Sequence, residues 1–224
     1  MKTRTVGVIA AMDCEAEPLK ARLKPLKEIP TSRGTLFTLA GERTAWALMV
    51  SGVGKCNAAA AAAVLIDRCR PDLLFNLGLC GSLSPDIGVG EVREVSACFQ
   101  YDFDLSEADG VPPFQLPGFA SPRIPLRRTG LFPAGVCATG DRFTSDPGQA
   151  EWLRMAGGEL REMELGAIAQ TAGKLPLLSL KAVTDRAGER SVEEYYARKE
   201  AGLRALDAAF EQVFRFLEEG GRLL

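Results

Sequence analysis

The sequence predicts an α/β fold with a single domain over residues 1–224, built on a mainly parallel (mixed) central sheet with helices on both faces. Two observations support this prediction. Short apolar runs of the buried-strand type alternate with helical stretches, a pattern typical of parallel sheets covered by helices. The chain also contains no internal repeat, low-complexity tract or linker-like stretch that would divide it into separate units.

The first half of the chain holds the clearest strand signals. Residues 5–12 form a continuous apolar run and predict a buried strand. Residues 35–40 and 44–50 flank the turn-like segment 41–43, which is a typical hairpin signal. The other elements expected here are helices over 16–23 and 57–68 and strands over 73–77 and 92–99.

The second half begins with a stretch over 107–133 that is rich in proline and glycine. It predicts a long loop, of the kind that usually serves as a lid or binding segment. Beyond it the alternation resumes, and an amphipathic helix is expected over 192–217. The elements between these two are strands over 136–139 and 177–183 and helices over 148–155 and 165–172.

Several predicted strands end at residues that can bind a ligand. Glu15 follows the first strand, and the glycine-rich segment 78–81 follows the strand over 73–77. Phe143 and Asp185 follow two later strands. Because ligands of open α/β sheets bind outside the carboxyl ends of the strands, we expect these groups to meet at one edge of the sheet.

Composition excludes several classes of site. The chain has no histidine, which rules out a Ser-His-Asp triad, a Cys-His dyad, an HExxH zinc site and an imidazole base. Proton transfer would then fall to Asp, Glu, Lys, Cys or Tyr with shifted pKa values. The six cysteines have no CxxC pair and no metal-ligand spacing, so we expect reduced thiols, no metal and a cytoplasmic location.

Charge and hydropathy give no sign of a macromolecular or membrane partner. The net charge of −2 provides no basic surface for nucleic acid or anionic lipid. The first apolar run soon meets Asp13 and Glu15, so it is interpreted as a strand rather than a signal peptide. The apolar stretch 58–66 is too short to span a bilayer.

Each acidic run also fits an ordinary structural role when taken alone. Glu162 and Glu164 suit a charged first helical turn, and Asp185 suits a helix cap or turn. The Gly-rich segment 52–55 is neither a Walker loop nor a dinucleotide fingerprint, since Asn57 stands in place of the third glycine.

Gathered at one edge, the carboxylates suit the cleavage of a purine N-glycosidic bond. That reaction needs an acid at purine N7, which a buried and protonated aspartic acid can supply. It needs a second carboxylate near the anomeric carbon to activate water and favour positive charge. A third carboxylate can accept two hydrogen bonds from the ribose hydroxyls.

Six segments together resemble the nucleoside phosphorylase/nucleosidase superfamily, specifically its 5′-methylthioadenosine/S-adenosylhomocysteine nucleosidase branch. The resemblance runs from Gly7 to about Tyr196, and its segments stand in family order. They are AMDCE at 11–15, SGVGK at 51–55, NLGLCG at 76–81, TGDRF at 139–143, EME at 162–164 and AVTD at 182–185. The resemblance implies a nucleoside phosphorylase-like fold, purine nucleosidase activity in methionine salvage, no cofactor and a homodimer.

The resemblance also implies a role for each matching position. Glu15 would activate the attacking water, and Asp185, supported by Thr184, would protonate the purine. Glu164 would hold the ribose hydroxyls, with Met163 against the sugar. The other substrate-binding positions are Phe143 against the purine, Val53 near the ribose or its 5′ side, and Leu79, Cys80, Gly81 and Glu162.

The chain departs from the family pattern at Leu79, Lys181 and Val192, where serine, arginine and an aromatic residue are common. These departures affect which 5′ substituent of the nucleoside is expected more than which reaction is expected. Hydrolysis is favoured over phosphorolysis because Asp13 and Glu15 would repel a phosphate ion. A futalosine or aminodeoxyfutalosine nucleosidase, a purine nucleoside phosphorylase and a non-catalytic nucleoside-binding or storage protein are the alternatives.

Overall fold

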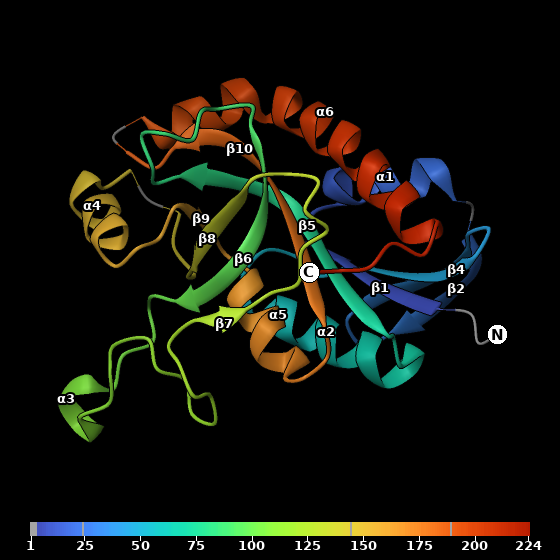
Figure 1. Cartoon of the computed structure of the whole chain (residues 1–224), viewed down its shortest axis with the longest axis horizontal. Coiled ribbons are helices and arrows are strands. Elements are labelled where there is room, and N and C mark those ends of the chain that lie inside the picture. The colour runs from blue at the N-terminus through green and yellow to red at the C-terminus, as the bar shows by residue number, and fades with distance from the viewer. Residues whose placement is uncertain (1–3, 24, 144, 189) are drawn as a thin grey trace.

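The computed structural model describes residues 4–23, 25–143, 145–188 and 190–224, and it shows a mixed sheet with helices on both faces (Figure 1). Its strands are β1 (Arg4–Ala10), β2 (Pro25–Thr31), β3 (Gly34–Ala40), β4 (Thr44–Val50), β5 (Leu73–Ser82), β6 (Val92–Gln100), β7 (Ile124–Pro125), β8 (Ala134–Thr139), β9 (Leu160–Glu162) and β10 (Leu177–Arg186). Its helices are α1 (Asp13–Arg22), α2 (Lys55–Cys69), α3 (Ser106–Asp109), α4 (Pro147–Met155), α5 (Leu165–Ala172) and α6 (Ser191–Glu218).

Strand β5 holds the centre of the sheet. It pairs in parallel with β1 and with β10, and its last residues pair antiparallel with β9. Strand β9 pairs with β8, β8 with β6, and β6 with β10, so these five strands close into a ring of pairings. Strands β4, β3 and β2 extend the sheet beyond β1. The predicted mixed sheet is confirmed, with parallel pairs at its centre and the antiparallel β2–β3 hairpin at one edge.

Two apolar cores lie on opposite faces of this sheet, because alternate residues of each buried strand point to opposite sides. Phe75 and Leu77 of β5 face Phe210 and Val213 of α6, on the side that also carries α1. The opposite face packs on α2 and α5, and a Cβ at Gly7 would lie 2.3 Å from Leu65 of α2. Within the described ranges, no helix is both long and apolar enough to cross a membrane.

Several predicted boundaries were wrong, and the differences concern the site. β5 and β10 each run past their expected ends, so the segment 78–81 and Asp185 lie inside strands rather than in loops. A register shift between Val183 and Asp185 lets β10 stay paired with β5 to its end. Residues 160–162 form a strand instead of starting a helix, because they pair with both β5 and β8.

Candidate active site

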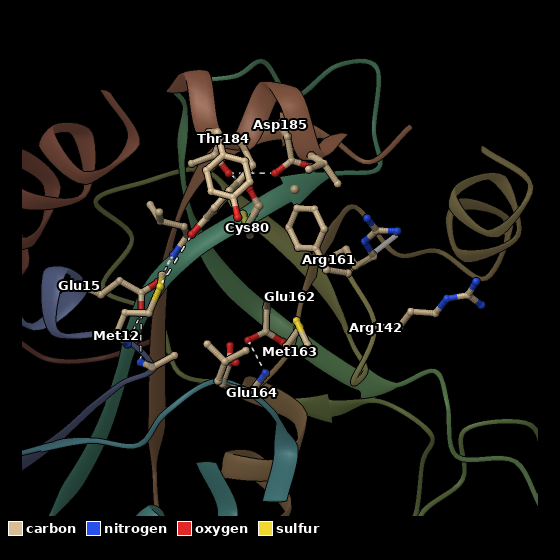
Figure 2. A pocket seen from close by; sticks show the side chains of 18 residues that line it. Met12, Glu15, Cys80, Arg142, Arg161, Glu162, Met163, Glu164, Thr184 and Asp185 are labelled. Atoms are coloured by element: carbon tan, nitrogen blue, oxygen red, sulfur yellow. Dashed lines mark hydrogen bonds between the residues drawn. The ribbon is translucent and has the colours of Figure 1, made fainter. Parts of the chain in front are cut away.

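All of the residues predicted to form a site line one cavity of about 500 Å³. Glu15 and Met12 lie on one side of it, and Asp185 with Thr184 lie toward the end covered by α6 (Figure 2). The acidic segment that follows β9 lies at the opposite end. The eleven predicted residues are Glu15, Val53, Leu79, Cys80, Gly81, Phe143, Glu162, Met163, Glu164, Thr184 and Asp185.

Glu15 is held by backbone donors from two elements. It is the third residue of α1, and its Oε2 accepts hydrogen bonds from the backbone N–H groups of Ala11 and Met12, at 3.1 and 3.0 Å. Its Oε1 accepts from the backbone N–H of Leu79 at 2.9 Å. Burial raises the pKa of Glu15, while these donors and the ammonium of Lys181 oppose the rise. A carboxylate held in this way is oriented to accept a proton from water.

Lys181 is a buried cation surrounded by carboxylates. Its Nζ lies 2.9 Å from Oε2 of Glu162, and both side chains are almost wholly shielded from solvent. Burial acts to lower the pKa of Lys181, but Glu162, Glu164 and Glu15 outweigh it and the pKa rises. This ammonium therefore offsets negative charge on the floor of the cavity.

Both carboxylate oxygens of Glu162 accept bonds from protein groups. The hydroxyl of Thr139 donates to Oε1 at 2.5 Å, and the N–H groups of Glu164 and Leu165 donate to Oε2 at 3.0 and 2.8 Å. These bonds tie the start of α5 to β8 and to Lys181. Glu162 thus links the protein groups at this end of the cavity to one another. Its expected contact with a ligand stays a prediction.

Glu164 lines the cavity, and among the described residues its Oε1 accepts a hydrogen bond from the backbone N–H of Gly54 at 2.8 Å. That N–H reaches it because Gly54 has a φ of 101°, a conformation that favours glycine. This close approach explains the Gly-rich segment before α2. Burial and the charge of Glu162 raise the pKa of Glu164 to about 7. Its second oxygen can accept bonds from a diol.

Asp185 is 1% exposed and is held from one side only. The hydroxyl of Thr184 lies 2.9 Å from its Oδ2, whereas its Oδ1 has no hydrogen-bond partner among the described residues. Burial raises the pKa of Asp185 to about 6, while Thr184 and Arg161 oppose the rise. An unsatisfied buried carboxyl oxygen is costly, so Oδ1 is suited to a ligand atom.

Phe143 and Val53 lie at the mouth of the cavity, with 45% and 48% of their surface exposed. The ring of Phe143 contacts Tyr195 edge to face, with a centroid distance of 5.5 Å. Tyr195 in turn places its hydroxyl 3.8 Å from the sulfur of Met12. A flat apolar group can therefore enter between these side chains and reach the buried carboxylates.

Sequence reasoning missed several residues of the cavity wall. Arg161 precedes Glu162 and Glu164, which suited a charged helical turn, and only its place in strand β9 puts it on the cavity wall. No sequence signal marked it, because β9 has only three residues and these are too few for a periodic pattern. The other missed wall residues are Ala11, Met12, Arg142, Tyr195 and Tyr196.

The loop over 107–133 does not contribute to the cavity wall. Among the described residues that line the cavity, none comes from this stretch, which instead carries β7. Its carboxyl end is bound to the buried Glu94, whose oxygens accept from the N–H groups of Thr129 and Gly130 at 3.1 and 3.0 Å. Its described residues therefore do not line the cavity, and a role of this stretch as a lid or binding segment stays a prediction.

Comparison with known proteins is consistent with this geometry. Residues 5–217 match the Phosphorylase superfamily. The 5′-methylthioadenosine/S-adenosylhomocysteine nucleosidase of Geobacillus thermodenitrificans is 32% identical over 202 residues, which cover 83% of this chain and 85% of that protein. The Bacillus subtilis enzyme of the same name is 31% identical, over 83% of this chain and 87% of its own length.

Solved structures agree in fold. The Neisseria meningitidis 5′-methylthioadenosine/S-adenosylhomocysteine nucleosidase, in complex with methylthio-immucillin-A, is 26% identical with a TM-score of 0.84, covering 91% of this chain and 95% of that one. The futalosine hydrolase of Helicobacter pylori has a TM-score of 0.85 at 20% identity, over 93% of this chain and 96% of its own, and so shares the fold alone. This chain belongs to the phosphorylase superfamily, in the branch of the 5′-methylthioadenosine/S-adenosylhomocysteine nucleosidases.

Proposed function

We propose that this chain is a purine nucleosidase that hydrolyses the N-glycosidic bond of an adenosine-type nucleoside, 5′-methylthioadenosine or S-adenosylhomocysteine, and releases adenine. The observation that carries the proposal is the meeting of Glu15, Glu164 and Asp185 at one cavity with different hydrogen-bond environments. The relatives from Geobacillus thermodenitrificans and Bacillus subtilis are both named as nucleosidases of these two compounds, which supports the proposal.

The proposed reaction divides the work between the two ends of the cavity. Asp185 in its protonated form donates its proton to purine N7, so that the electron pair of the breaking C1′–N9 bond passes to a protonated base, which leaves as neutral adenine. Glu164 holds the ribose hydroxyls and stabilises positive charge on the sugar. Glu15 accepts a proton from the water that attacks C1′. Adenine and the free 5-thio-substituted ribose leave.

Hydrolysis is preferred over phosphorolysis because of the charges around Glu15. Phosphate must approach the anomeric carbon from the side of the attacking group, where the carboxylate of Glu15 would repel it. Asp13, expected from the sequence to add to this repulsion, is exposed outside the cavity and pairs with Lys20. Arginines suit a phosphate site, but Figure 2 places Arg142 and Arg161 across the cavity from Glu15. The favoured nucleophile is therefore water.

Purified protein should release adenine from 5′-methylthioadenosine in buffer without phosphate. Adenine is measured by chromatography or by a coupled xanthine oxidase assay, with matched reactions containing phosphate as the control. A strict requirement for phosphate, with a pentose 1-phosphate as product, would assign the chain to the phosphorylases instead. Tight binding of the nucleoside without any product would assign it to the binding proteins.

We also propose that the chain forms a homodimer in the cytoplasm. Val53 and Phe143 leave about half of their surface exposed at the cavity mouth, as expected if a second copy covers that region. The six cysteines are all free thiols, which suits a reducing compartment. Sedimentation equilibrium should give twice the chain mass at micromolar concentration, and a monomer mass would contradict the dimer.

A further inference from the structure

The buried arginine Arg161 lines the same cavity as Asp185, the proposed acid at the purine. Arg161 of β9 and Asp185 of β10 both pair with the same residue of β5, Gly81. They therefore flank Gly81 from its two neighbouring strands. A Cβ at position 81 would lie only 2.7 Å from Oδ1 of Asp185, so Oδ1 has room there because residue 81 is a glycine. Arg161 is 6% exposed and lines the same cavity.

The two side chains sense each other electrostatically. Burial lowers the pKa of Arg161, and the charges of Tyr101 and Asp185 oppose that effect. Arg161 in turn acts against the upward shift that burial imposes on the pKa of Asp185. A guanidinium stays protonated at neutral pH and offers five N–H donors and no acceptor, so it can donate to an acceptor on a bound ligand.

Purines differ at the edge that such a pair of donors would meet. Next to the N7 acceptor, a 6-oxopurine presents a second acceptor, O6, whereas adenine presents an amino donor. A protonated Asp185 at N7 with a guanidinium beside it matches two neighbouring acceptors. Adenine satisfies only the first of these donors.

We propose that Arg161 binds the 6-position of the base and that this cavity hydrolyses 6-oxopurine nucleosides as well as adenine nucleosides. The inference rests on the proposed nucleosidase function and concerns its choice of base. Water adds to C1′, the C1′–N9 bond breaks, and its electron pair passes to the base while Asp185 delivers a proton to N7. Negative charge that develops on O6 during this step is stabilised by Arg161.

The test compares two nucleosides that differ only at position 6, 5′-methylthioadenosine and 5′-methylthioinosine. The wild-type protein should release hypoxanthine from the second as well as adenine from the first. Arg161→Met should lower kcat/KM for 5′-methylthioinosine about 10- to 100-fold relative to 5′-methylthioadenosine, the scale of one charge-assisted hydrogen bond to a base edge. Arg161→Lys keeps one charged donor and should recover part of this ratio.

The ratio of the two substrates makes the test independent of protein yield and folding. Arg142→Met removes a second arginine from the rim of the cavity, outside the row through Gly81, and should leave the ratio unchanged. A wild-type protein that cleaves 5′-methylthioadenosine but not 5′-methylthioinosine overturns the inference and leaves the proposed function intact. An equal loss on both substrates in Arg161→Met overturns it too. Failure to cleave either nucleoside instead overturns the proposed function.

Discussion

Asp185→Asn and Glu15→Gln are each expected to lower kcat for 5′-methylthioadenosine by at least about 10²-fold, the usual scale for a general acid or base. The amide that replaces the carboxyl of Asp185 cannot deliver a proton to N7, and the amide that replaces the carboxylate of Glu15 cannot take one from water. Both replacements keep the size of the side chain. Initial rates of adenine release at saturating substrate measure the effect, and wild-type turnover in either variant would remove that residue from the mechanism.

The Asp185→Asn variant also has an expected signature in stability, which separates lost chemistry from lost folding. Burial raises the pKa of Asp185 from 3.8 to about 6. Between pH 3.8 and about 6 this carboxyl is protonated in the folded protein but ionised in the unfolded chain. The free energy of unfolding of the wild-type protein therefore falls as pH rises through this range. A shift of two pKa units corresponds to about 3 kcal/mol.

Asparagine carries no such penalty. The unfolding free energy of Asp185→Asn relative to wild type should therefore increase from about pH 4 to about pH 7 and level off above, by the linkage just described. Urea titrations at several pH values measure it. An inactive variant that is also less stable than wild type at pH 8 would indicate damage to the fold rather than loss of the acid.

The second large effect is expected from Lys181→Met. Removing the ammonium leaves Glu162 without its cationic partner inside the protein, where Lys181 and Glu162 are both nearly solvent-free. Breaking a buried ion pair from one side typically costs about 3–5 kcal/mol of folding stability. Denaturant unfolding should show this loss. Lys174→Met, at an exposed lysine beyond α5, is the matched control and should change stability little.

Lys181 should also affect the pH range of the reaction. Its charge lowers the pKa of Glu15 and of Glu164, against the upward effect of burial. In Lys181→Met both pKa values should rise, so the acidic limb of the kcat/KM profile should move to higher pH. Lys181→Arg keeps the positive charge and should hold the limb near its wild-type position. An unshifted profile in Lys181→Met would leave this lysine with a purely structural role.

The sequence was most informative where hydrophobic periodicity is long. β1 and β5 were predicted because each contains a continuous apolar run, and β4 because it and β3 flank a hairpin turn. α6 was predicted because its apolar positions recur at helical spacing. Short or exposed elements were missed. β2 is largely exposed and contains two prolines, and β9 has only three residues, so neither carries a readable pattern.

By itself the sequence determined the kind of chemistry available: no histidine, and carboxylates from separate segments that were expected to meet at one edge of the sheet. Only the tertiary structure decided what surrounds each carboxylate. It gave both oxygens of Glu162 hydrogen-bond donors, left Oδ1 of Asp185 without a partner among the described residues, and placed Arg161 on the cavity wall. The physical reason is that burial and charge at a site depend on strands far apart in the chain, whose pairing and register no local pattern encodes.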